Sequence, residues 1–109
     1  MPTTPTNTAF RVGLTGDFYR NGQPVYPDFD LGPLQREAGL ELSTFDEHRE
    51  EIAAEQLANL NGVVVLSPRV TRRSLEHSQQ LLAISRFGVG YDTVDVAACT
   101  EHDVALCIA

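Results

Sequence analysis

A glycine-rich turn, Gly88-Val89-Gly90, is the segment of this sequence best suited to binding chemistry. Glycines keep side chains out of the way, so that backbone N–H groups can point toward a ligand. A concave row of such donors binds anions well, and a carboxylate is a natural guest. The residue pattern alone favours a plain strand-to-helix connection over an anion-binding turn.

The same turn resembles half of a dinucleotide-binding motif. A Gly-x-Gly-x-x-Gly search finds Gly88 and Gly90, but Thr93 stands where the third glycine belongs. The following helix is predicted to begin late, near Asp95, and no ribose-binding acid follows on a second strand. We therefore predict that no cofactor binds to this turn.

Other reactive side chains are scattered. Two cysteines and three histidines lack the spacing of a metal site, and no serine lies in a Gly-x-Ser-x-Gly turn. Arg69, Arg72 and Arg73 form a local basic cluster, for which a solvated helix start is favoured over a phosphate site. We predict no catalytic residue and no metal ligand in this chain.

Composition narrows the class of protein. The 109 residues carry 15 acids against 8 bases, for a net charge of −7, and every base is arginine. This balance argues against nucleic acid as a partner. The longest apolar run, Val63 to Leu66, is too short to cross a membrane. Cys99 and Cys107 lie among small apolar residues, so we predict reduced, buried cysteines in a cytoplasmic protein.

Alternating strands and helices are predicted to position the turn, in one domain over residues 10–109 after a flexible tail, residues 1–9. The predicted strands are Phe10–Leu14, Leu40–Phe45, Gly62–Leu66, Ala83–Phe87 and Val104–Ile108. The predicted helices are Leu31–Ala38, capped by Asp30, then Glu50–Leu60, Ser74–Gln80 and Asp95–His102. This order predicts an α/β fold with a doubly wound, parallel, five-stranded sheet and helices on both faces.

Ligands of such sheets bind beyond the carboxyl ends of the strands. That rule singles out three loops, Thr15–Pro27, Ser67–Thr71 and Gly88–Thr93. The first is long and aromatic, and a binding role and a packing role are equally favoured for it.

The stretch from Leu82 to Cys99 resembles a hallmark of the D-isomer-specific 2-hydroxyacid dehydrogenases. That hallmark is a strand, then Gly-x-Gly-x-Asp-x-x-Asp, an alanine-rich helix and a returning strand. Gly88, Gly90, Asp92 and Asp95 match its motif, and Ala97-Ala98 matches its helix. Weaker similarity extends back to about Glu50.

The resemblance implies that this chain is the flavodoxin-like substrate-binding domain of a two-domain enzyme. The backbone amides of Val89 and Gly90 would bind the carboxylate of a small substrate, with Gly88 shaping the turn. Asp92 and Asp95 would organise the turn and cap the helix. Arg69 is a further candidate for contact with an anionic group. Its spacing differs from that of the arginine found in phosphohydroxyacid members, so a phosphoglycerate substrate is not favoured.

The resemblance also implies what the chain lacks. NAD or NADP would be held by a nicotinamide-binding domain absent from this sequence, and the family's catalytic Arg, Glu and His would lie there too. We therefore expect the 109 residues alone to be inactive and to bind no cofactor, and the full-length protein to form a homodimer. Two alternatives stay open: a non-enzymatic flavodoxin-like or receiver-like binding module, and a corepressor-type regulator of the same family.

Overall fold

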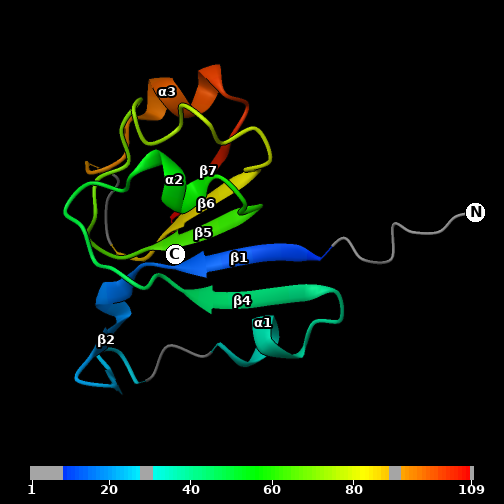
Figure 1. Ribbon diagram of the computed structural model, residues 1–109, viewed down its shortest axis with the longest axis vertical. Helices are drawn as coiled ribbons and strands as arrows, with labels where there is room; N and C mark the ends of the chain where they lie inside the picture. Colours follow the sequence, from blue (N-terminus) through cyan, green and yellow to red (C-terminus); the bar gives the residue numbers. More distant parts are fainter. Residues whose placement is uncertain (1–8, 28–30, 89–91, 109) are drawn as a thin grey trace, which may run out of the picture.

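The computed structural model describes residues 9–27, 31–88 and 92–108. Its main sheet has five parallel strands in the order β4-β1-β5-β6-β7 (Figure 1). The strands are β1 (Phe10–Leu14), β4 (Leu40–Thr44), β5 (Gly62–Val65), β6 (Ala83–Arg86) and β7 (Ala105–Ile108). The strand order is that of a flavodoxin-like, doubly wound sheet. The predicted fold class is confirmed, and each predicted strand agrees with an observed one to within one residue at either end.

The sheet separates two hydrophobic clusters. Side chains alternate between the faces of a strand, so Val63 and Val65 of β5 lie on one face and Val64 on the other. The larger cluster also contains Ile84 and packs beneath the segments that follow β5 and β6, whereas the smaller includes Leu14 of β1. Burial on both faces explains why β5 is an uninterrupted apolar run rather than an alternating one.

Three short helices connect the strands in the described residues: α1 (Gly32–Arg36), α2 (Ala54–Leu57) and α3 (Val96–Glu101). Figure 1 shows α2 and α3 on the same side of the sheet, with α1 beside β4. The Asp95 carboxylate accepts a hydrogen bond from the Ala98 amide at 3.0 Å, so its predicted role as the cap of α3 is confirmed. Pro33 lies in the first turn of α1, as expected.

The predicted helix Glu50–Leu60 is wrong at both ends, because α2 spans only Ala54–Leu57. Residues 50–52 instead run beside Arg69, with a 2.7 Å hydrogen bond from the Arg69 amide to the Glu50 carbonyl and a 2.9 Å bond from the Ile52 amide to the Arg69 carbonyl. Ile52 is buried by this pairing and not by a helical stripe. The helix begins only at Ala54.

The predicted helix Ser74–Gln80 is also wrong. Its backbone bonds join residues three apart, as from the Leu75 amide to the Arg72 carbonyl and from the Ser78 amide to the Leu75 carbonyl. The Ser78 hydroxyl donates to the same Leu75 carbonyl, at 2.8 Å. Serine side chains that bond to nearby backbone compete with helix formation. The segment therefore forms successive tight turns, which still bury Leu75 and Leu81.

A small hairpin was not predicted. Strands β2 (Tyr19–Arg20) and β3 (Gln23–Pro24) pair antiparallel after a single 3-10 turn, η2 (Gly16–Phe18). Asn21 and Gly22 connect them with φ angles of 53° and 78°. Two successive positive φ values define the turn that best suits a two-residue hairpin, and Asn-Gly is its preferred sequence.

The two cysteines lie in different environments. Cys99 is buried as predicted, and burial raises the pKa of its thiol. The prediction that Cys107 is buried is wrong, because β7 forms an edge of the sheet and exposes this side chain. Both are free cysteines.

Two further predictions concern residues that the structure does not describe, and a third concerns membrane-spanning segments. The tail lies outside the described residues up to Thr8, and so does the Asp30 cap. In the part of the chain that the structure describes, no helix is long and apolar enough to cross a membrane.

We predict that Ile84→Ala lowers the free energy of unfolding by about 2–5 kcal/mol, because it opens a cavity in the larger cluster. Ile84 is 0% exposed, whereas Leu82, two residues earlier, is 56% exposed. Leu82→Ala is the matched control and should cost less than about 1 kcal/mol. Urea denaturation of both variants measures the difference, and equal losses would contradict this assignment of the core.

Candidate functional site

A pocket of about 790 Å³ lies over the carboxyl ends of β1, β5 and β6. The chain moves to one side of β1 to form β4 and to the other side to form β5, so this is the point where the strand order reverses. Ligands of doubly wound sheets bind at this point. The pocket is lined by Gly16, Asp17, Tyr19, Arg20, Val25, Tyr26, His48, Leu66, Ser67, Arg86, Phe87 and Gly88.

Asp17 joins the loop after β1 to the loop after β5. One of its carboxylate oxygens accepts a 2.7 Å hydrogen bond from the Thr15 hydroxyl. The other accepts from the Ser67 amide at 3.1 Å and from the Ser67 hydroxyl. The buried Thr15 hydroxyl accepts in turn from the Leu66 amide at 3.1 Å. The Asp17 carboxylate therefore holds the two loops together, and most of its lone pairs already accept hydrogen bonds.

Aromatic rings form one wall of the pocket. The Phe87 ring lies between Phe18, with 5.8 Å between ring centroids, and Tyr26, at 5.1 Å. Edge-to-face and tilted contacts of this kind stabilise beyond the area they bury. The rings fix the long loop after β1 against the end of β6. Of the two roles open for this loop, the packing role is observed, and its residues also line the pocket.

Gly88 begins the glycine turn, in a backbone conformation that suits glycine, with φ at 149°. A Cβ built on Gly88 would lie 1.8 Å from Nη1 of Arg86. That nitrogen donates a 2.8 Å hydrogen bond to the Phe87 carbonyl, and Nε of Arg86 lies 3.5 Å from the Thr93 hydroxyl. The guanidinium thus contacts both ends of the turn and occupies the space that a side chain at position 88 would need.

The backbone on either side of the turn is held by neighbouring segments. Before the turn, the Phe87 amide donates to the Val65 carbonyl at 2.8 Å. After it, the Val70 amide donates to the Thr93 carbonyl at 2.8 Å, and the Asp95 amide to the Val70 carbonyl at 2.8 Å. Both ends of the predicted anion-binding turn are therefore fixed. Val89 and Gly90, the predicted carboxylate-binding residues, lie outside the described residues.

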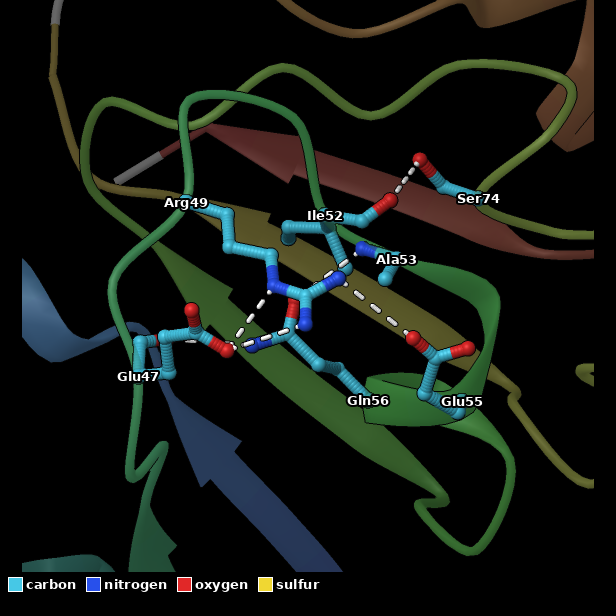
Figure 2. Close-up of polar contacts among 7 residues, drawn as sticks. All are labelled: Glu47, Arg49, Ile52, Ala53, Glu55, Gln56 and Ser74. Atoms are coloured by element: carbon cyan, nitrogen blue, oxygen red, sulfur yellow. Dashed lines mark hydrogen bonds and ion pairs between the residues drawn. The ribbon is translucent and has the colours of Figure 1, made fainter.

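His48 reaches the pocket from the loop after β4. Hydrogen bonds and ion pairs hold this loop against α2 (Figure 2). The Gln56 side chain accepts from the Ala53 amide and donates to the Glu47 carbonyl, both at 3.0 Å. Arg49 lies between Glu47, at 2.9 Å, and Glu55, at 3.4 Å, and its hydrogen bond with Glu47 raises the pKa of the guanidinium.

The far end of this loop is tied to the turns after β5. The Ser74 hydroxyl donates to the Ile52 carbonyl at 2.6 Å, a bond that Figure 2 also shows. The sequence pattern around His48 gave no sign of its place in the pocket, because that place depends on this folded loop.

Arg69 lines a second pocket, with Glu51, Thr71 and Asp95 among its neighbours, and does not line the pocket that contains Gly88. Its backbone pairs with residues 50–52, as described above. The structure therefore does not bring Arg69 and Gly88 together in one pocket, and contact of Arg69 with an anionic substrate group stays a prediction.

Two pocket arginines were missed by sequence reasoning. Arg20 belongs to the unpredicted β2–β3 hairpin, and Arg86 was counted as part of a strand. The Asn21-Gly22 pair was the available signal for the hairpin and hence for Arg20. Across the described residues, no group of three or more His, Cys, Asp or Glu is arranged to hold a metal.

Comparisons with known proteins agree on a family. The family model of the D-isomer specific 2-hydroxyacid dehydrogenase catalytic domain matches residues 24–109. The chain is similar to (S)-sulfolactate dehydrogenase of Chromohalobacter salexigens, with 35% identity over 80 residues. That alignment covers 70% of this chain and 25% of the relative, so the chain spans about a quarter of the curated relative that it matches.

Two solved structures share the fold. The D-lactate dehydrogenase of Escherichia coli superposes with a TM-score of 0.66 at 17% identity, covering 91% of this chain and 31% of that one. The pyruvate reductase of Chlamydomonas reinhardtii gives a TM-score of 0.68 at 17% identity, covering 95% and 30%.

We predict that Gly88→Ala lowers the free energy of unfolding by about 1–3 kcal/mol, since the new Cβ strains the backbone and displaces the Arg86 guanidinium. Gly16→Ala is the control in the same pocket, because a Cβ there would lie 3.5 Å from its nearest neighbours. Urea denaturation measures both. In a double-mutant cycle, Gly88→Ala should cost less stability in the Arg86→Ala background than in the wild type. If the two losses of unfolding free energy simply add, Arg86 does not occupy this space.

Proposed function

Because this chain belongs to the D-isomer specific 2-hydroxyacid dehydrogenase family, we propose that it is the substrate-binding domain of an NAD(P)-dependent oxidoreductase. The enzyme would interconvert a D-2-hydroxy acid and a 2-oxo acid. The observation that carries the proposal is the pocket at the point of strand reversal, bordered by a glycine turn whose two ends are held in place.

The turn would bind the substrate carboxylate through the backbone amides of Val89 and Gly90. Backbone donors suit this task, since they hold a carboxylate by charge-assisted hydrogen bonds without themselves titrating. The substituent on the substrate's C2 would then extend into the pocket, toward Phe87 and Tyr26. This chain's part in the reaction is to bind and orient the substrate.

The described residues do not fit a dinucleotide. Thr93 replaces the third glycine of the cofactor motif, α3 begins only at Val96, and Arg86 occupies the space beside Gly88. We therefore assign the nicotinamide, which exchanges a hydride with C2 of the substrate, and the acid–base residues to another part of the full-length protein. The full-length protein is also proposed to be a homodimer.

The stereochemistry in the relative's name supports the D-isomer. The sulfur-bearing carbon of sulfolactate outranks the carboxyl group in the naming rules, whereas the methyl group of lactate does not. (S)-sulfolactate therefore has the same spatial arrangement as D-lactate. A 2-hydroxy acid of this hand is the substrate class that we propose.

We expect the full-length protein to oxidise NADH or NADPH in the presence of 2-oxo acids and to form the D-hydroxy acid. Absorbance of the reduced cofactor gives the rate, and chiral chromatography identifies the product. Binding of 2-oxo acids without turnover would favour a corepressor-type regulator of the same family. Formation of the L-hydroxy acid would contradict the proposed D-stereochemistry.

Gly90→Val in the full-length protein should lower kcat/KM about 10- to 100-fold, since its side chain would disrupt a charge-assisted hydrogen bond to the carboxylate. Ala97→Val, at an exposed position of α3, adds the same branched group away from the pocket and is the control. An unchanged KM for Gly90→Val would rule out the carboxylate role of the turn.

The 109 residues alone should give no rate above a buffer blank with NADH and any 2-oxo acid. The physical reason is that the described residues do not fit a dinucleotide, so the isolated chain would hold no hydride donor. The measurement is the same absorbance assay on the isolated chain. Turnover above the blank would show that the catalytic residues lie within this chain.

A further inference from the structure

We propose that the pocket selects 2-oxo and 2-hydroxy acids that carry a second anionic group, and that Arg20 and Arg86 bind this group. The inference rests on the proposed function and specifies its substrate class. The acceptable second groups share one chemistry, that of a carboxylate, sulfonate or phosphonate oxyanion on the C2 substituent.

The first observation is that these two arginines lack ionic partners. Among the described residues, Arg11, Arg49 and Arg72 each pair with a glutamate within 4.0 Å. Arg20 and Arg86 have no carboxylate within that distance in the same part of the chain, although the protein has nearly twice as many acids as bases. The same holds for Arg36, Arg69 and Arg73, but none of these three lines the pocket that contains Gly88. Two positive charges therefore remain without ionic partners in the pocket that contains Gly88.

The second observation is that the pocket's own carboxylate is directed elsewhere. Asp17 accepts three hydrogen bonds, from Thr15 and Ser67, which hold its oxygens toward the loop after β5. It forms no ion pair with Arg20 or Arg86. The arginines thus outnumber the carboxylate in the pocket lining.

The third observation concerns how the two guanidinium groups are presented. Arg86 uses Nη1 and Nε on the Phe87 carbonyl and the Thr93 hydroxyl, which orders the group beside the glycine turn. A guanidinium carries five N–H donors, so donors remain for a ligand. Arg20 lies on the β2–β3 hairpin, and its side chain makes no hydrogen bond or ion pair with a described residue.

Arginine suits this task because its planar fork binds oxyanions through paired hydrogen bonds and keeps its charge at any ordinary pH. The glycine turn would take the carboxylate on C1, and the arginines the second anion on the substituent. A substrate with a neutral substituent would make none of these charge-assisted hydrogen bonds, which disfavours its binding relative to a dianion.

The test uses the full-length protein and compares 2-oxo acids that differ in charge. Oxaloacetate is matched against 2-oxosuccinamate, in which an amide replaces the distal carboxylate at similar size. Arms with 3-sulfopyruvate and 3-phosphonopyruvate identify the preferred oxyanion, and pyruvate reports the activity without any such group. We expect kcat/KM for at least one dianionic acid to exceed that for 2-oxosuccinamate at least about tenfold, the effect of one charge-assisted hydrogen bond.

Arg20→Gln should reduce this preference about tenfold or more, whereas Arg36→Gln, an exposed arginine of α1 outside the pocket, should leave it unchanged. Raising the ionic strength should weaken the preference as well. If all 2-oxo acids are reduced with similar kcat/KM, or if Arg20→Gln leaves the ratio intact, the second-anion site is wrong while the proposed function stands. If no 2-oxo acid is reduced, both are wrong.

Discussion

Two backbone amides, those of Leu66 and Ser67, lie just past the last residue of β5, and side chains of the loop after β1 satisfy both. The hydroxyl of Thr15 and the carboxylate of Asp17 make these bonds, and they also bond to each other. A buried amide left without a partner costs about 1–3 kcal/mol, and of these two amides that of Leu66 is partly buried. This network therefore decides where the two central loops leave the sheet, and it places the hairpin that carries Arg20 over the strand ends.

Pairing between loops continues across the same edge of the sheet. Glu51 pairs with Arg69, and Val70 with Val94, each in parallel and beyond the ends of the main strands. The connections after β4, β5 and β6 are consequently tied to one another, and the end of the glycine turn is fixed by a neighbour more than twenty residues away. The site is therefore positioned by backbone hydrogen bonds between these loops.

The sequence was informative where burial is regular. Uninterrupted β-branched runs such as Val63–Val65 can be covered on both faces only in a central strand, so the sheet could be predicted closely. The helices predicted around Ile52 and Leu75 were wrong in extent or in kind, because buried apolar residues also occur in isolated bridges and tight turns. The glycine turn was found from its residue types. Asp17, Ser67 and Arg86 were not, because their roles depend on partners that only the folded chain brings near, or on the pocket around them.

The hairpin turn that positions Arg20 at the pocket is also a site where the protein can be modified chemically with time. Asparagine followed by glycine is the pair most prone to deamidation, because glycine does not hinder attack of its own backbone nitrogen on the asparagine amide. At Asn21-Gly22 this reaction would leave an aspartate or isoaspartate next to Arg20 in an exposed turn. Each molecule that ages in this way gains a negative charge beside the pocket, and the isoaspartate form also gains an extra backbone atom in a two-residue turn. Stored preparations would become chemically heterogeneous at the rim of the binding pocket.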